Sequence, residues 1–290
     1  MVSTTPKQFK IMKKGWILAL TAVFLFTGTV IWSAFKSVAR LPLFVPEPEV
    51  LWNDPTSKEA RRLFFEAEAP YKVNVEAPVQ VELVPDFNGI ELIGDTSLMQ
   101  YLGVQTVQMN GSTQIGIYIK NETTDEVAKE LAQPDSPTHA SFRAAHILAR
   151  IGLGTDPNRQ WKQREFRFSD CINVTANTPL KASYLHLSFN AIDSSQVHVQ
   201  AEDLTVQFPA FAFKNPYYSR LEGQCERIVV NQFTAGTLDA TALDARDFYM
   251  YQPKEANIHV RASRLVRMMG VENCKIAVEG EPPYRWIEQK

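Results

Sequence analysis

Short apolar strands recur about every 20 residues through the C-terminal half of this 290-residue chain. Within each strand apolar and polar side chains alternate, which is typical of a half-buried strand. One column of such strands lies at residues 185–187, 204–206, 228–230, 248–250 and 266–268. A second, offset column lies at 197–199, 211–213, 238–240, 258–260 and 276–278. Repeats of this length are typical of solenoids, in which each coil stacks on the one before it.

The alternation also predicts which side chains face the core. In the strand 258–260, Ile258 and Val260 point inward and His259 points outward. Stacked coils lie about 4.8 Å apart, so these side chains continue a column from one coil to the next. We therefore predict a mainly β fold, a parallel β-helix. A β-sandwich, whose strands recur every 8–12 residues, is the alternative.

Composition restricts the partners and the chemistry of the chain. The 30 basic and 32 acidic residues give a net charge of -2, which argues against a nucleic-acid partner. The three cysteines lack the CxxC spacing of a zinc site, so we predict no metal site and no cofactor. A bridge between Cys225 and Cys274 is conceivable, with free buried thiols as the commoner alternative.

The N-terminal region predicts a membrane anchor. Residues 15–35 carry no charge and, as a helix, would span about 30 Å, the hydrocarbon thickness of a bilayer. The lysine-rich segment 1–14 precedes them, which predicts a cytoplasmic N-terminus. We expect a single-pass protein of the inner membrane whose C-terminal domain is periplasmic or extracellular. A cleavable signal peptide, normally with a shorter apolar run, is the alternative.

The rest of the chain divides into a linker and a folded domain. Residues 36–69 are rich in proline and end in a possible short helix at 57–69. We place the domain at 70–290 and expect a helical insertion at about 122–165, with helices over 122–133 and 137–153. The basic stretch 159–167, at the end of this insertion, is interpreted as a solvated strand edge or loop.

The order of the strands resembles a known bacterial family. The matching residues are Val81-Glu82-Leu83, Gly94-Asp95, Leu98, Tyr101, Val107, Asn110-Gly111 and, near the end, Gly280 and Pro282. They resemble the auto-transporter adhesin head GIN domain, an exported domain, over roughly residues 70–285. The resemblance implies a right-handed parallel β-helix and a binding role. The Ser-Gly-Ser-Gly-Asp turns of that family are missing here, which puts any shared function of the turns in doubt.

A search for chemistry yields no catalytic motif. The chain has no nucleophile elbow, P-loop, HExxH or dinucleotide fingerprint. Asp239 and His259 should lie one coil apart with His198 in the same outward column, an arrangement that we interpret as an exposed polar ladder. The aromatic residues Phe208, Phe211, Phe213, Tyr217 and Tyr218 are either core packing or a protruding surface for a glycan or protein partner.

We therefore predict an exported, membrane-anchored domain for binding, adhesion or envelope scaffolding, without catalytic residues. Its partners would be the lipid bilayer, through residues 15–35, and a glycan or envelope protein whose binding residues the sequence does not identify. Two alternatives remain. One is a β-helix enzyme acting on carbohydrates, and the other is a regulatory anchor that couples the domain to a partner in the membrane.

Overall fold

The computed structural model describes residues 60–290 apart from 86, 110–111, 121–128, 131–132, 134–135, 155, 157–158 and 209–216. The predicted membrane segment 15–35 and the linker up to residue 59 lie outside this range. No helix among the described residues is long and apolar enough to cross a membrane. All described residues belong to one compact unit, Lys58–Lys290.

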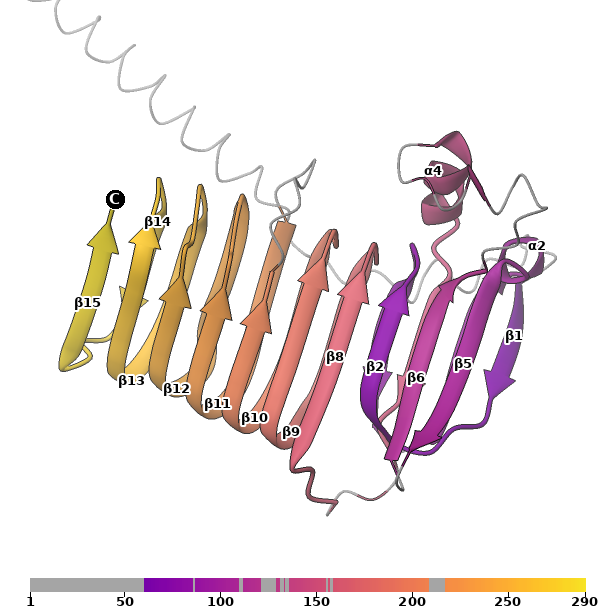
Figure 1. Cartoon of the computed structure of the whole chain (residues 1–290), viewed down its shortest axis with the longest axis horizontal. Helices are drawn as coiled ribbons and strands as arrows, with labels where there is room; N and C mark the ends of the chain where they lie inside the picture. The colour runs from indigo at the N-terminus through magenta and orange to yellow at the C-terminus, as the bar shows by residue number, and fades with distance from the viewer. Residues whose placement is uncertain are drawn as a thin grey trace, which may run out of the picture. The chain divides into compact units, whose positions relative to one another are not determined.

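The unit is a β-solenoid of about six turns. Its repeating strands run down one sheet, bend, and return up a second sheet, so that each strand contributes one leg to each sheet (Figure 1). We call the sheet of the first legs the back sheet and that of the second legs the front sheet. The repeating strands, in chain order, are β9 (Asn173–Asn190), β10 (Ser194–Gln207), β11 (Tyr217–Asn231), β12 (Gly236–Tyr251) and β13 (Asn257–Val271).

Shorter strands complete both sheets. In the front sheet β9 is followed by β8 (Gln163–Ser169), β2 (Pro70–Glu76), β6 (Ser112–Ile119) and β5 (Leu102–Met109). In the back sheet it is followed by β3 (Gln80–Val84), β7 (Leu148–Gly152), β4 (Ile90–Asp95) and β1 (Ala60–Phe65). Beyond β13, β14 (Lys275–Glu279) extends the back sheet and β15 (Tyr284–Gln289) extends the front sheet.

The register confirms the first predicted column throughout. Leu185, Leu204, Ile228, Phe248 and Val266 are successive Cα partners in the front sheet. Because neighbouring repeats pair in parallel, the β-sandwich alternative is wrong. The right-handed sense of the coil stays a prediction.

The second column is confirmed in part. Leu238, Ile258 and Ile276 are successive partners. Val197, however, pairs with Leu221, so residues 211–213 are not the strand that follows 197–199. The strand β11 begins only at Tyr217, and the aromatic stretch before it lengthens the connection from β10. Periodicity failed here because residues 211–213, which lie outside the described residues, are themselves apolar and imitate the repeat in sequence.

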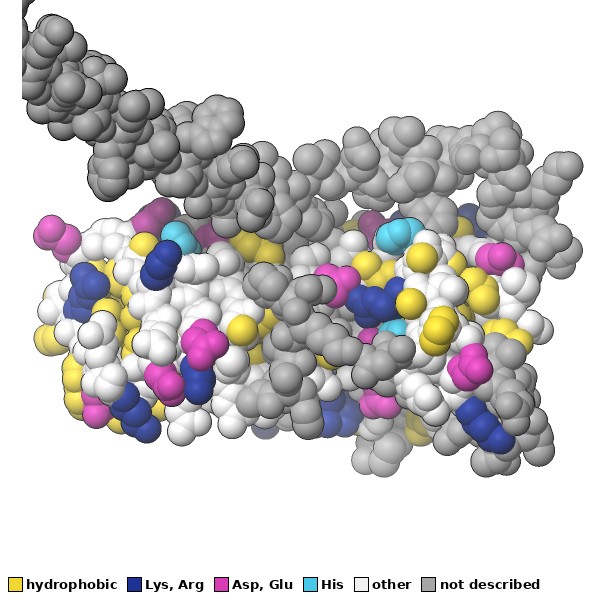
Figure 2. All heavy atoms as spheres, turned by 90° about the horizontal axis from the view of Figure 1, so that it is seen from above, with side chains coloured by type: hydrophobic (Ala, Val, Ile, Leu, Met, Phe, Trp, Pro, Cys, Tyr) yellow, Lys and Arg dark blue, Asp and Glu magenta, His cyan; other side chains and the backbone are white. Residues whose placement is uncertain are grey.

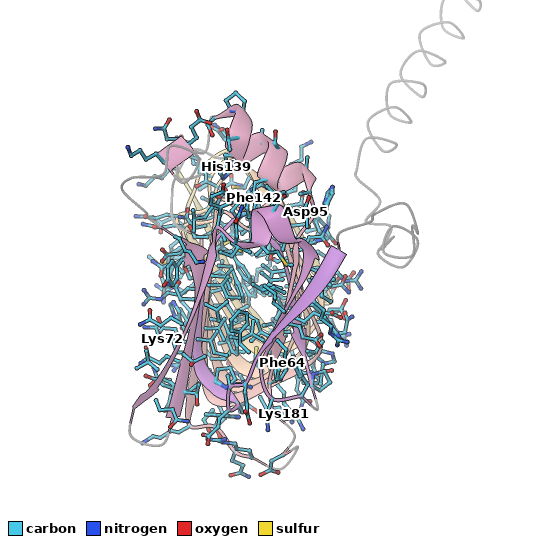
Figure 3. All side chains as sticks on the ribbon, turned by 90° about the vertical axis from the view of Figure 1, so that its right-hand side faces the viewer. Phe64, Lys72, Asp95, His139, Phe142 and Lys181 are labelled. Carbon is cyan, nitrogen blue, oxygen red and sulfur yellow. The ribbon has the colours of Figure 1, made fainter. Side chains whose placement is uncertain are left out.

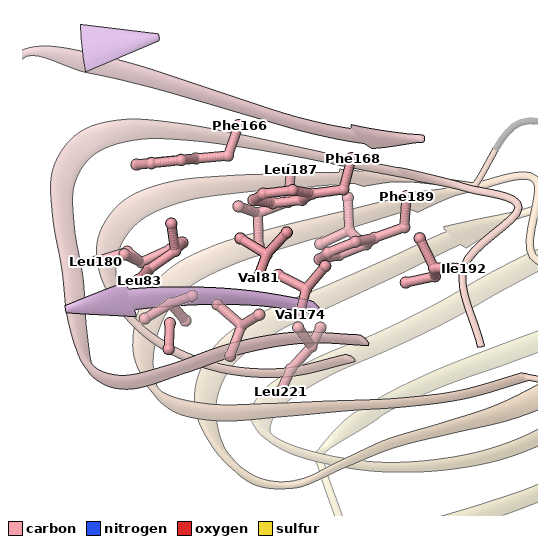
Figure 4. Packing of buried hydrophobic residues seen from close by; sticks show 14 of the residues in the cluster. Val81, Leu83, Phe166, Phe168, Val174, Leu180, Leu187, Phe189, Ile192 and Leu221 are labelled. Carbon is pink, nitrogen blue, oxygen red and sulfur yellow. The ribbon is translucent and has the colours of Figure 1, made fainter. Parts of the chain in front are cut away.

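Side chains from the two sheets meet in one continuous core (Figure 4). Near the upper edge the core contains an aromatic ladder with ring centroids 4.8–5.8 Å apart. Its members are Phe168, Phe189, Phe208, Tyr217 and Phe233. Phe208 and Tyr217 are therefore buried core residues rather than a protruding surface, while Phe211 and Phe213 lie outside the described residues. Tyr218 is partly buried and donates a hydrogen bond to Asp239.

Two predicted helical regions are corrected. Residues 60–65, expected within a short helix, form β1, which pairs antiparallel with β4. The helix predicted over 137–153 ends early as α4 (Pro137–Ala144), capped by Ser136, and residues 148–152 form β7. Within the described part of 122–165, the helical insertion is thus a long connection between β6 and β7. The chain also forms the short helix α2 (Thr96–Met99) and the antiparallel pair of β5 and β6.

The connections from front to back sheet share an unusual backbone conformation. Positive φ angles occur at eight described residues other than glycine, all in these upper turns: His146, Asp170, Ala191, Gln232, Ala235, Gln252, Glu255 and Asn273. The left-handed region is unfavourable for side chains that carry a Cβ, and glycine adopts it without that penalty. The fold therefore keeps the geometry of a glycine turn while the sequence supplies larger residues.

We expect the substitution Gln252→Gly to raise the free energy of unfolding by about 0.5–1 kcal/mol, because glycine relieves the strain at φ 53°. Urea unfolding followed by circular dichroism measures the change. The matched control is Thr205→Gly within β10, where the loss of a strand side chain should lower stability by about 0.5–1 kcal/mol. A destabilised Gln252→Gly variant would contradict the argument.

Candidate functional site

The outer side of the bends is hollowed by a polar groove. It has a volume of about 840 Å³ and crosses five successive strands, β9 to β13. At about 4.8 Å per coil the groove is about 19 Å long, enough for an extended ligand. Figure 3 places Lys181, one of its lining residues, at the bottom of the unit, opposite His139 and Phe142 at the top.

Small side chains at the bends shape this groove. Ala182, Ala201, Cys225, Ala245 and Ala262 are successive Cα partners, one from each coil. The two sheets converge here, and a larger side chain would separate the legs that must join. The outer surface along this column of small residues is therefore recessed. The polar residues on either side of the column form the walls of the groove.

A ladder of polar side chains runs along the groove. Lys181, Gln200, Gln224 and Asp244 are successive partners on adjacent coils, and all four are exposed. None of them forms a side-chain hydrogen bond or ion pair with any described residue. Neighbouring charged side chains, by contrast, form ion pairs: Arg246 pairs with Glu226 at 3.3 Å, and Arg227 pairs with Asp203 at 2.7 Å. The ladder is therefore available to a ligand.

Trp161 stands at the β9 end of the groove. Its carbonyl oxygen accepts a hydrogen bond of 2.8 Å from the backbone of Ser183, which fixes the preceding loop against the first bend. Two guanidinium groups lie over its ring, that of Arg159 at 4.0 Å and that of Arg164 at 4.8 Å from the centroid. Trp161 and Arg159 both line the groove.

Arg164 occupies a position that the other coils give to aliphatic residues. It is the Cα partner of Leu185, at the start of the first column, and only 3% of it is exposed. Its Nε and one Nη donate to the carbonyl oxygen of Pro70 at 3.2 and 2.9 Å. Burial, assisted by the nearby charge of Arg159, lowers the pKa of Arg164 to about 9. No described carboxylate pairs with either arginine.

From the sequence, the basic stretch 159–167 is predicted to be a solvated strand edge or loop, and the structure instead buries Arg164. Arg159, Trp161, Gln200 and Gln224 were not identified as binding residues. The signal was present, because each glutamine stands beside the small residue of its repeat. Recognising it requires the position of the bend, which alternation does not reveal.

The predicted polar ladder of the back sheet is confirmed in part. Asp239 and His259 are Cα partners, whereas His198 pairs with Glu222 and lies further away. The Asp239 carboxylate accepts hydrogen bonds from the backbone and hydroxyl of Thr241 and from the hydroxyl of Tyr218. Partial burial raises the pKa of Asp239, but these hydrogen bonds and the charge of Arg220 outweigh it, so the net pKa is lowered. Such a carboxylate is a structural acceptor and a poor general base.

The cysteines do not form the conceivable bridge. Cys225 lies in a bend and Cys274 follows an upper turn, and all three cysteines are free. Burial raises the pKa of the Cys225 thiol to about 12, with the carboxylates of Asp244 and Glu226 adding to the effect. The described residues include no group of three or more side chains that could hold a metal ion.

The helix α4 is fastened to the upper turns, away from the groove. Arg143 donates to the carboxylates of Asp170 at 3.1 Å and Asp193 at 2.6 Å, which belong to two successive turns. The imidazole of His139, almost fully buried, lies 2.6 Å from Asp170. Seen from above, charges of both signs are scattered over this edge (Figure 2). The arrangement holds an insertion in place and provides no reactive group.

Comparison with known proteins supports the fold. No family model matches the chain, and no curated protein matches it. A solved structure from Bacteroides fragilis, named a "putative adhesin", is 12% identical with a TM-score of 0.57, and the match covers 81% of this chain and 94% of that one. A "putative lipid binding protein" from Parabacteroides distasonis is 13% identical with a TM-score of 0.49, over 80% of this chain and 95% of that one. The first similarity shows a shared fold.

We expect Cys274 to react with iodoacetamide at pH 8 well before Cys225. With a pKa of about 12, only about one Cys225 thiol in ten thousand is ionised at that pH, and it is largely buried. Peptide mass spectrometry after timed labelling measures both rates, and labelling in urea is the control that should equalise them. Rapid labelling of Cys225 in the native protein would show that the bend is not packed as described.

Proposed function

We propose that this protein is an exported, membrane-anchored binding or adhesion domain without catalytic activity, and that the groove along the bends is its binding surface. The observation that carries the proposal is the ladder of Lys181, Gln200, Gln224 and Asp244, four exposed polar side chains in register with no partner among the described residues. Polar groups that a fold leaves unpaired in a groove are available for recognition.

A glycan is the ligand class that fits this lining best. The amides of Gln200 and Gln224 each donate and accept hydrogen bonds, as sugar hydroxyl groups do. The lining is mainly polar, so it lacks the apolar pockets that would select peptide side chains. Similarity in fold to a structure named an adhesin is consistent with a binding role.

The same surface gives little support to an enzyme. A glycoside hydrolase needs two carboxyl groups about 5–10 Å apart across the scissile bond, one of them with a raised pKa. Of the acidic residues in the groove, Glu226 is paired with Arg246 and Glu202 accepts a hydrogen bond from Ser183. Asp244 alone is uncommitted, and one carboxylate does not make such a pair.

We expect the double substitution Gln200→Ala/Gln224→Ala to weaken glycan binding about tenfold to a hundredfold, because each lost hydrogen bond contributes about 0.5–1.5 kcal/mol. A glycan array with the full chain identifies the ligand, and isothermal titration measures the affinities. Gln207→Ala, on the outer face of the front sheet, should bind like the unaltered protein. Binding unaffected by the double substitution would exclude the groove, and release of cleaved sugar would exclude a non-catalytic role.

We also propose that residues 15–35 anchor the protein in the inner membrane with residues 58–290 outside the cytoplasm. In bacterial cells the full chain should remain with membranes after carbonate extraction, and deletion of 15–35 should abolish this retention. Deletion of the proline-rich residues 41–55 is the control and should leave the retention unchanged. Protection of the C-terminal domain from protease added to spheroplasts would contradict the orientation.

A further inference from the structure

At the Trp161 end of the groove, two arginines form no ion pair with any carboxylate that the structure describes. Arg159 and Arg164 lie over the same indole, at 4.0 and 4.8 Å, so two like charges are held close together. Arg164 is 97% buried, and the acceptor of its side-chain hydrogen bonds among the described residues is the carbonyl oxygen of Pro70. A buried charge without a counter-ion is unfavourable by several kcal/mol in general. Other surface arginines of the unit, such as Arg150 and Arg227, have carboxylate partners.

A third cation completes this cluster. Lys181 lines the same end of the groove, and it is exposed and without a described ion-pair partner. Its neighbour Glu202 lies one coil further along and accepts a hydrogen bond from Ser183. We name Arg159, Trp161, Arg164 and Lys181 the cationic end.

At the opposite end, the arginines that line the groove have carboxylate partners, Arg246 with Glu226 and Arg264 with Asp247, which leaves one acidic side chain uncompensated. Asp244 is exposed and unpaired there, and Glu226 forms only a 3.3 Å ion pair with Arg246, both side chains being more than half exposed. A uniformly acidic polymer would be attracted at the cationic end and repelled by Asp244. A ligand with a single acidic group at one end meets both requirements.

We propose that the groove binds a glycan whose terminal sugar carries a carboxylate, and that the cationic end binds this acidic sugar. This inference rests on the proposed function. Arg159 and Lys181 bind the carboxylate from the groove wall. Arg164 lies beneath Trp161 and adds its charge from the protein side. The neutral sugars that follow lie along Gln200 and Gln224 toward Asp244.

The test compares three probes by isothermal titration with the full chain. The first is a tetrasaccharide of neutral hexoses ending in one uronic acid, the second is the same chain ending in a neutral hexose, and the third is tetragalacturonate. We expect the first probe to bind at least tenfold more tightly than either of the others, and its advantage should shrink with added salt.

Substitutions assign the effect to the cationic end. Arg159→Gln should remove most of the advantage of the acid-ended probe and leave the affinity for the neutral probe within about twofold. Arg167→Gln is the matched control, because Arg167 lies eight residues further along the chain on β8, is exposed, and pairs with Glu165. Thermal unfolding of each variant checks that the fold is retained. In Asp244→Asn the affinity for tetragalacturonate should rise.

The outcomes separate the two proposals. If the neutral and acid-ended probes bind equally, the acidic ligand is wrong and the glycan groove stands. If none of the three probes binds and a glycan array is also blank, the proposed function itself fails. Tighter binding of poly-glutamate than of the acid-ended probe would overturn the glycan in favour of an acidic peptide.

Discussion

Everything in this unit depends on keeping successive coils in register. A strand leg cannot bury its apolar side alone, and it gains burial only when the next coil places similar side chains one step away. The fully buried sequence of Leu204, Ile228, Phe248 and Val266 meets that condition in the front sheet. The small-residue column at the bends meets it where the sheets join. A change in the length of one leg would displace every inward side chain after it.

Register also explains where unpaired polar side chains are found among the described residues. Once the inward positions are committed to packing, the outward positions repeat every coil and form straight ladders. On the back sheet such a ladder is used internally, as the hydrogen bonds of Asp239 show. Along the bends it is left unpaired. The contrast between committed and uncommitted ladders distinguishes the groove from the other polar surfaces of the unit.

The sequence predicted the part of the fold that periodicity governs. The five strands of the first column and the pairing of Leu238 with Ile258 and Ile276 followed from alternation and spacing. The predictions were wrong where the local sequence is also compatible with a helix but the chain forms a strand. Residues 60–65 form a strand because β4 offers them an unpaired edge, a tertiary contact that no local pattern contains. Residues 148–152 continue the back sheet for the same reason, although their apolar spacing also suits a helix.

The candidate site was less predictable than the fold, because it depends on which residues a bend brings together. Trp161 and Gln224 are more than 60 residues apart in sequence, and only the stacking of coils places both in one groove. Arg164 was counted among solvated charges, since an arginine at a column position is indistinguishable in sequence from one on a loop. Its burial is a property of the first coil alone.

The two edges of the solenoid differ in how freely the chain can vary there. Bends must keep a constant path between the legs, and their inner residues are alanine or cysteine in every repeat from β9 to β13. The upper crossings have no such limit, as both the α4 connection and the long link before Tyr217 demonstrate. Segments can therefore be gained or lost at the upper edge during evolution without disturbing the groove along the bends.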